Sequence, residues 1–384
     1  MFVVAIAQLS AGVGNAVGVR EFLILAGLFI PIWWAWVGFT FYADRFDTDD
    51  ALHRVVMFAG MFAVAALAST IPEAYEGDTT GFAVSYAVVR LIVVALNARA
   101  WWHLPAARPL LNAYIPAFTA SALLFLVSAA LPAPARYTLW AAALAIDLGT
   151  PLVSAERIRL VPIHTSHIPE RVGLFTIIVF GETVLAVVIG TETVSWAWDS
   201  GLVAALGFAT AAVIWWLYFD YLGAGIVRRT IAAGQVYLFA HLPLLIGLTA
   251  FGVGVKLAIK STGGDRLLGG TAWMLGGGAA LVLASMALIH VARTLTMRDL
   301  GLWLRVGAVL VAIVGAALGD MLGAVGLSAL LAAAVGGRLV LELARHQRQP
   351  SLDLELVGNE LEGRGPSIPM DSHANRPPDQ VADH

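Results

Sequence analysis

The fold class is decided by the stretch Ser166-His167-Ile168-Pro169-Glu170-Arg171-Val172-Gly173-Leu174-Phe175-Thr176-Ile177-Ile178-Val179-Phe180-Gly181-Glu182-Thr183. Polar residues and a proline open it, and an apolar helix long enough to cross a bilayer follows. Glu182 lies about half-way along that helix. A carboxylate is costly in hydrocarbon, so this side chain must face protein, water or a partner. We therefore expect the stretch to be the centre of a polytopic membrane protein.

The composition excludes a water-soluble protein. Of the 384 residues, 59% are hydrophobic and 13% are charged, where a soluble domain carries about 25% charged residues. Apolar runs of about 20 residues recur as far as Leu343, and each can span the hydrocarbon core as a helix. The strands of a membrane barrel would be half as long and would alternate in polarity. Cysteine is absent, which excludes disulfides and thiolate metal sites.

The sequence predicts an all-α, polytopic transmembrane helical bundle with about twelve spans, of which the first is too short to cross comfortably. Arginines cluster in alternate connections, so we expect both termini to be cytoplasmic in a bacterial inner membrane. The basic group Lys256, Lys260 and Arg266 falls in a connection that this assignment places outside the cell. It therefore disagrees with the charge pattern and marks a span boundary that could be mis-drawn. The spans are Phe2 to Ala16, Phe22 to Tyr42, Leu52 to Ile71, Thr80 to Trp101, Leu110 to Leu131, Tyr137 to Ser154, Ile168 to Gly190, Trp198 to Leu222, Gln235 to Val255, Leu267 to Val291, Leu302 to Leu318 and Leu322 to Leu343.

An internal similarity predicts two parallel six-helix repeats within a transmembrane domain of residues 1–346. Ile32-Trp33-Trp34-Ala35-Trp36 is echoed by Ile214-Trp215-Trp216-Leu217-Tyr218, and we expect both tryptophan pairs to pack between helices. The halves would be residues 1–160 and 164–346, related by an axis along the membrane normal. This alignment places Gln8 opposite Glu182. Residues 347–384 are rich in proline, glycine and acidic residues, which predicts a disordered cytoplasmic tail.

Three segments resemble the bacterial low temperature requirement A family of membrane proteins. They are His167 to Glu182, the run Trp215-Trp216-Leu217-Tyr218-Phe219-Asp220, and the run Phe2-Val3-Val4-Ala5-Ile6-Ala7-Gln8-Leu9-Ser10. Members usually begin the first helix with Glu-Leu-Phe-Phe-Asp, which is missing here. The native start could therefore lie upstream of Met1. The first-helix pattern is also faintly similar to that of endolysosomal-type potassium channels, which are built as two six-helix repeats.

The first candidates for a functional role lie along one face of the central helix. Glu182 follows Arg171 by eleven residues, which is three helical turns, and Phe175 and Ile178 lie between them. The functional interpretation is a line for cations or protons with Glu182 as the binding site or relay. The structural alternative is that Glu182 accepts a hydrogen bond from a neighbouring helix. Gln8 and Asp220 are further pathway candidates.

Other ionisable residues are structural or pH-sensing candidates. Glu170 suits a capping role in the first helical turn. His164 and His167 precede it at intervals of three residues, but Pro169 interrupts the regular spacing, so we expect no metal site and regard a pH sensor as the better alternative for His167. Further candidates are buried within the predicted spans, where two of them could form an ion pair. These are Asp147, Arg90 and His241.

These observations predict a permeation or transport protein for small cations or another small solute. The alternative is a non-transporting membrane protein, either a stress-response scaffold or a lipid-acting enzyme. Phosphate-binding loops, nucleophile elbows and zincin helices are absent from the sequence, so we expect no ATP-driven transport and no cofactor. Enzymatic activity is expected only under the alternative of a lipid-acting enzyme. The expected partners are the lipid bilayer, the transported solute and further copies of the chain, and not nucleic acid. A polar cavity between the first and seventh spans would favour transport.

Overall fold

The computed structural model describes residues 1–14, 17–46, 50–162, 167–192, 194–221, 230–264, 266–294 and 300–346. Residues Met1–Leu339 form one compact unit, and a second begins at Val340. The described part of the chain contains helices and no strands. The helices are α1 Phe2–Gly12, α2 Val19–Arg45, α3 Ala51–Ser69, α4 Ile71–Glu76, α5 Thr80–His103, η1 Pro105–Ala107, α6 Arg108–Ser128, α7 Ala135–Val153, α8 Ala155–Ile158, α9 His167–Glu192, α10 Trp198–Tyr221, α11 Ile231–Lys260, η3 Trp273–Gly277, α12 Gly278–Thr294, α13 Leu300–Ala317 and α14 Gly319–His346.

The all-helical, multi-pass prediction is confirmed, and each of the twelve predicted spans coincides with a helix. Within the described residues, nine helical stretches are long and apolar enough to cross a membrane. The three other predicted spans correspond to α1, α7 and α13. Helix α1 has 11 residues and α13 has 18, of which Gly301–Ala317 forms a shorter apolar helix. A helix of 11 residues covers only about 16 Å, so α1 does not cross a hydrocarbon core by itself.

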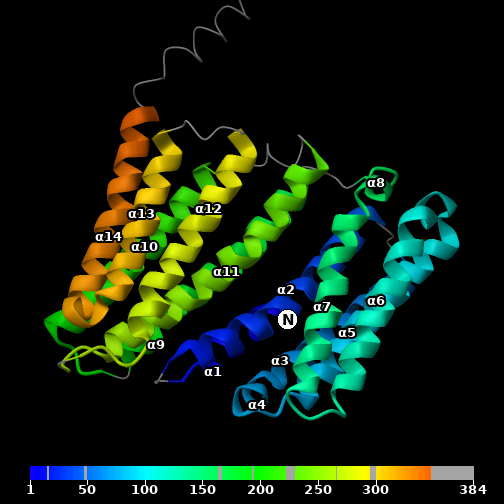
Figure 1. Cartoon of the computed structure of the whole chain (residues 1–384), viewed down its shortest axis with the longest axis horizontal. Helices are drawn as coiled ribbons and strands as arrows, with labels where there is room; N and C mark the ends of the chain where they lie inside the picture. The colour runs from blue at the N-terminus through cyan, green and yellow to red at the C-terminus, as the bar shows by residue number, and fades with distance from the viewer. Residues whose placement is uncertain are drawn as a thin grey trace, which may run out of the picture. The chain divides into compact units, whose positions relative to one another are not determined.

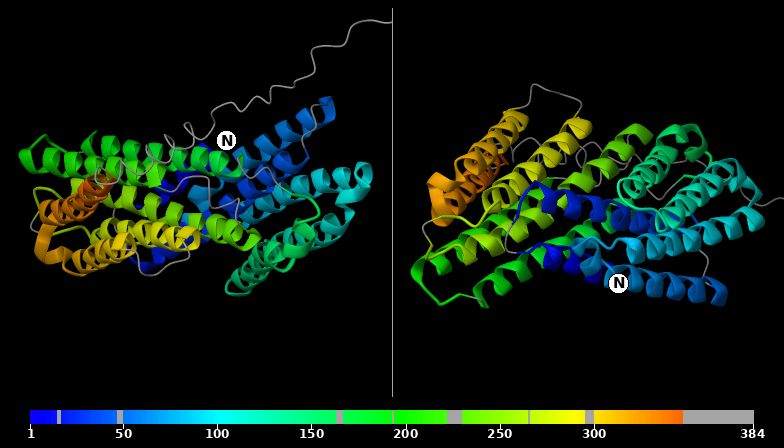
Figure 2. Two further views of the ribbon diagram at one scale, coloured as in Figure 1. Left: turned by 90° about the horizontal axis from the view of Figure 1, so that it is seen from above. Right: turned by 60° about the horizontal axis from the view of Figure 1, so that its bottom comes forward.

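The helices of the first and second halves of the chain lie on opposite sides of α1 (Figure 1). Helix α5 packs against α3, α2 and α6, and α6 packs against α7. On the other side, α11 packs against α9, α10 and α12. Helix α1 contacts α2, α3 and α4 from one group and α9 and α11 from the other. Two further views separate the same two groups (Figure 2). The short first helix therefore fills the seam between the halves.

Helix α11 is the most enclosed of the long helices, and it corrects a predicted boundary. It begins at Ile231 and ends at Lys260, five residues beyond the predicted end at Val255. Its apolar surface is covered on several sides. In its most hydrophobic stretch of 18 residues, 89% of the residues are buried. Lys256 therefore lies inside the helix, where it is 8% exposed, and does not belong to an external loop.

Small residues allow α11 to approach its neighbours closely. A Cβ atom at Gly254 would lie 2.3 Å from the backbone nitrogen of Leu275, and one at Gly247 would lie 2.9 Å from the carbonyl oxygen of Gly278. Leu275 belongs to a π-helical turn, Trp273–Gly277, that precedes α12. Only glycine permits backbones to pack at this separation.

The two tryptophan pairs of the predicted repeat have different environments. Trp33 and Trp34 are 1% and 2% exposed, as expected for side chains packed between helices. Trp215 and Trp216 are 47% and 44% exposed, so the prediction that they also pack between helices is wrong. They face outward because α10 contacts its neighbours α9 and α11 through its other face. The six-helix repeat stays a prediction, and the predicted tail lies outside the described residues.

Candidate functional site

Glu182 lies in a polar cluster where α9 meets α1 and α11. The residue is half-buried, ten residues before the end of α9. Its carboxylate lies near the hydroxyl of Ser10 in α1 and within electrostatic range of the ammonium of Lys256 in α11. The Lys256 ammonium donates to the backbone carbonyl of Ser10, with 3.4 Å between the nitrogen and the oxygen. Ser10 thus connects an acid and a base from two other helices.

The position of Lys256 has a physical explanation in the end of α1. The last four carbonyl groups of a helix have no partner within the helix, and they form the negative end of its dipole. Ser10 supplies one of these carbonyls, because α1 ends at Gly12. The ammonium of Lys256 satisfies it and places a positive charge at that end. The cluster therefore stabilises the end of a helix buried between the two halves, and it pairs the charge on Glu182.

Arg171 belongs to a different seam, between α9 and the end of α2. Its guanidinium donates to the carbonyl of Thr40 at 3.2 Å. One turn earlier in α9, Nδ1 of His167 lies 3.9 Å from a carboxylate oxygen of Asp44, which is buried. Eleven residues of helix separate Arg171 from Glu182 by about 16 Å. The structure therefore does not bring these two predicted site residues together.

An aromatic cluster lies between Arg171 and Glu182 on the same face of α9. The ring of Phe175 lies 5.1 Å from that of Trp33, 4.8 Å from that of Trp36 and 6.4 Å from that of Phe2, between ring centres. Phe175 is 1% exposed. We call Phe2, Trp33, Trp36 and Phe175 the aromatic plug. It fills the seam between α1, α2 and α9, about two turns before Glu182 along α9.

The remaining pathway candidates differ in their exposure. Ile178 and Gln8 are half-buried, Ile178 one turn before Glu182 and Gln8 in the middle of α1. Asp220 is exposed at the end of α10, and Glu170 is exposed in the first turn of α9, where its charge complements the helix dipole.

Arg90 and Asp147 form an ion pair between α5 and α7. Their side chains are fully buried, and Nη2 of Arg90 lies 2.6 Å from Oδ1 of Asp147. The hydroxyl of Tyr86 donates to the other carboxylate oxygen at 3.1 Å. Two opposite charges and a hydroxyl together make the buried acid tolerable. This pair ties α5 to α7 within the first half.

His241 belongs to a second buried network, which connects α11, α10 and α9. Its Nδ1 lies 2.6 Å from the carbonyl oxygen of Tyr237, which can only accept, so this nitrogen carries the proton. Its Nε2 lies 2.9 Å from the hydroxyl of Tyr218, which contacts Thr176 at 3.2 Å. The neutral imidazole satisfies this geometry by accepting from Tyr218. The contacts favour a structural role for His241.

Metal ligation finds no support among the residues that the structure describes, where no group of three or more His, Asp and Glu side chains could hold an ion. His164, which the sequence places three residues before His167, lies outside the described residues.

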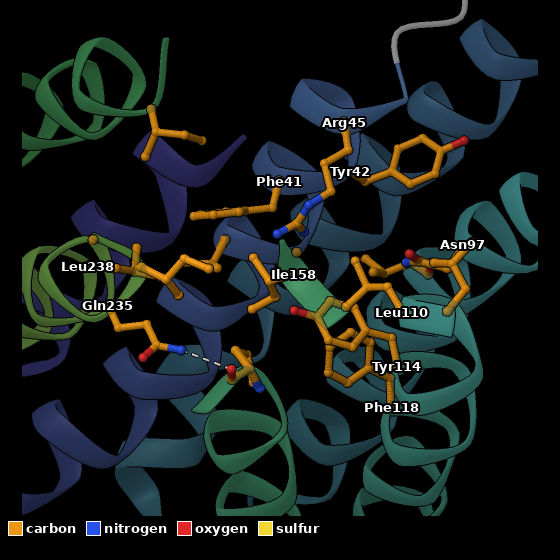
Figure 3. A pocket seen from close by; sticks show the side chains of 18 of the residues that line it. Phe41, Tyr42, Arg45, Asn97, Leu110, Tyr114, Phe118, Ile158, Gln235 and Leu238 are labelled. Atoms are coloured by element: carbon orange, nitrogen blue, oxygen red, sulfur yellow. Dashed lines mark hydrogen bonds between the residues drawn. The ribbon is translucent and has the colours of Figure 1, made fainter. Parts of the chain in front are cut away.

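The principal cavity lies away from the seam between α1 and α9. It has a volume of about 350 Å³, and its walls come mainly from α2, α5, α6 and the first turns of α11 (Figure 3). Arg45 points into it from the end of α2, and Gln235 on its wall donates to the carbonyl of Pro151 at 2.9 Å. Glu182 does not line this cavity.

Two members of the Glu182 cluster were missed by sequence reasoning. Ser10 is one of many small polar residues, and nothing local distinguishes it. Lys256 carried a signal, because it was part of the basic group that disagreed with the charge asymmetry of the loops. Extending the apolar helix by five residues beyond Val255, to Lys260, would have placed it inside the bundle.

Comparison with known proteins gives the family and no established activity. The family described as bacterial low temperature requirement A protein (LtrA) matches residues 1–339. An uncharacterized protein of Rhizobium meliloti (strain 1021) is 28% identical over 307 residues, which cover 71% of this chain and 74% of that protein. No solved structure matches. The match of the family over nearly all of the described chain shows that this protein belongs to the bacterial low temperature requirement A (LtrA) family.

Proposed function

We propose that this protein is a permeation or transport protein for a small cation or another small solute. In this proposal the membrane is the bacterial inner membrane, both termini are cytoplasmic, and Glu182 lies on the pathway. The observation that carries the proposal is the acid–base cluster of Glu182, Ser10 and Lys256, held inside the bundle by three helices. Ionisable groups at this depth are costly, and they commonly mark the pathways of ions or protons.

The pathway runs along the face of α9 that carries Arg171, Phe175, Ile178 and Glu182. The aromatic plug closes it in this structure, since Phe175 contacts three rings from α1 and α2. Movement of α1, which is short and contacts both halves, would open the seam. Protonation of Glu182, or a cation bound to it, would weaken its attraction to Lys256 and loosen α1.

The test is the flux of potassium, sodium and protons into proteoliposomes that contain the full chain. We expect Glu182→Gln to reduce the flux of the transported cation at least about tenfold, because the amide neither titrates nor carries charge. Glu170→Gln is the matched control, since it removes an exposed acid from the same helix. Wild-type vesicles without flux of any of these cations would end the cation proposal.

A non-transporting role is the second candidate, and a specific observation favours it. Lys256 has a structural task at the end of α1, and Glu182 neutralises its charge. A scaffold or a lipid-acting enzyme would need the cluster only for stability. In that case Glu182→Gln would lower the thermal stability of the protein in detergent, and no cation would cross in the wild type.

A further inference from the structure

The cavity of Figure 3 has the size and the lining of a small-molecule site. Its volume of about 350 Å³ lies within the range of such sites, which are concave and mostly apolar. The apolar wall contains side chains from three long helices. These apolar side chains are Trp34 and Phe41 of α2, Leu110 and Leu111 of α6, and Leu238 and Phe239 of α11.

The charged groups of this wall are all basic. Arg45, Arg90 and Arg159 line the cavity, and no carboxylate does so among the described residues. Arg159 is paired with Glu156 at 3.2 Å. The guanidinium of Arg45 donates to the carbonyl of Val161 and lies over the Phe41 ring at 5.4 Å. An anion entering the cavity would therefore meet positive charge at its outer end.

Arg90 offers unused hydrogen-bond donors at the inner end. Its Nη2 binds Asp147, whereas Nε and Nη1 have no hydrogen-bond partner among the residues that the structure describes. The side chain is fully buried, and the ring of Phe118 covers the guanidinium at 4.3 Å. Buried donors are nearly always satisfied in folded proteins, so a fully buried arginine with two free nitrogens on a cavity wall indicates a missing acceptor.

Gly38 lies close to one of these nitrogens. A Cβ atom at this position would lie 3.2 Å from Nη1 of Arg90 and 3.3 Å from Val93. Gly38 itself lines the cavity. Any side chain at this position would therefore crowd the free donor.

We propose that this cavity binds an amphipathic organic monoanion, a carboxylate carried on an apolar chain or ring. The carboxylate accepts a hydrogen bond from Nη1 of Arg90, the free nitrogen beside Gly38, and the apolar part packs against the wall formed by Trp34, Leu110 and Phe239. Arg45 attracts the anion and remains at the outer end. This site is separate from the Glu182 cluster and does not depend on the proposed transport of cations.

The test measures binding to the full chain in nanodiscs of zwitterionic lipid, by equilibrium dialysis with empty discs as the blank. The probes are 4-phenylbutyrate, the neutral 4-phenylbutan-1-ol and the cationic 4-phenylbutylamine, which share one apolar group. We expect saturable binding of one 4-phenylbutyrate per chain, and binding at least about tenfold weaker for the other two, because a charge-assisted hydrogen bond is lost.

Two variants locate the binding site, each with a matched control on the same helix. Gly38→Ala crowds the free nitrogen without changing any charge, and Arg45→Gln removes the outer charge; each should weaken binding several-fold. Gly27→Ala adds a Cβ with no atom of the structure within 4 Å, and Arg20→Gln removes an exposed charge at the opposite end of α2, so both should bind as the wild type does.

Some outcomes would overturn the proposal. Equal binding of acid, alcohol and amine would mean that the cavity selects only for apolar surface. Equal affinities of Gly38→Ala and Gly27→Ala would mean that Arg90 is not the anchor. Discs with anionic lipid identify the source of the natural anion: competition with 4-phenylbutyrate assigns the site to a lipid, and unchanged binding assigns it to a free carboxylate. A negative result in these binding experiments does not affect the flux test of Glu182.

Discussion

At the scale of single residues, two clusters in the described part of the chain share charge between helices. Asp147 in α7 is held by Arg90 and Tyr86 of α5, and Glu182 in α9 lies near Ser10 of α1 and Lys256 of α11. The spacing of acids along the sequence indicates which residues are buried. It does not indicate the partner, because each partner lies at least 57 residues away in the chain.

The ion pair gives a stability prediction. We expect Asp147→Asn to lower the free energy of unfolding by about 3–5 kcal/mol, because it leaves the buried Arg90 without a counter-charge. The double variant Arg90→Met, Asp147→Leu should recover most of this loss, since it removes both charges together. Unfolding in detergent, followed by circular dichroism against temperature or denaturant, checks both values. A double variant less stable than Asp147→Asn would contradict the prediction.

At the scale of elements, local signals at the helix ends explain where several helices begin and end. Helix α3 begins after Asp50, whose carboxylate accepts from the backbone nitrogen of His53 at 2.7 Å and also binds Arg99. The guanidinium of Arg136 donates to the carbonyls of Ser128 and Leu131 at the end of α6. Such side chains satisfy the backbone groups that a helix leaves unpaired. The sequence predicted these boundaries to within a few residues.

The cap of α3 predicts a dependence of stability on pH. The amide of His53 and the guanidinium of Arg99 hold the pKa of Asp50 below its usual value. A carboxyl group with a lowered pKa in the folded state stabilises the protein above its unfolded pKa, and this contribution is lost as the pH falls through the folded pKa. The wild type should therefore have a higher melting temperature than Asp50→Ala at pH 7, and the difference should shrink as the pH falls below about 4.

The melting temperatures of both proteins in detergent between pH 7 and pH 3 check this prediction. A difference that stays constant over the whole range would mean that the charge on Asp50 contributes nothing to the cap.

At the scale of the whole molecule, α11 organises the second half and α1 fills the seam between the halves. Helix α11 depends on close approach of backbones. Gly254 packs against the π-helical turn before α12, and Gly252 packs against Thr183 of α9. Thr183 also donates to the carbonyl of Leu248 at 3.3 Å, a bond between helices that close packing permits.

The closest of these approaches gives a further prediction. We expect Gly254→Ala to lower the free energy of unfolding by about 1–3 kcal/mol, because its Cβ would overlap the backbone of Leu275. Gly149→Ala in α7 is the control, since no atom lies within 4 Å of its added Cβ, and it should be neutral or slightly stabilising. Equal effects of the two substitutions on thermal unfolding would show that the close approach contributes no stability.

The sequence by itself determined the class of the protein and the order of its helices, because long apolar runs allow only helices in a bilayer. It also determined the family, because three of its segments carry the family's motifs. It also identified Asp147, Arg90 and His241 as buried polar positions, and Glu182 as a polar position within a membrane helix. Only the tertiary structure decided how these groups combine: Glu182 lies near Lys256, Trp215 and Trp216 face outward, and a basic cavity is lined by residues other than the central acid. The physical reason is that apolar periodicity specifies that a face is covered, whereas its partner depends on which distant helices pack together.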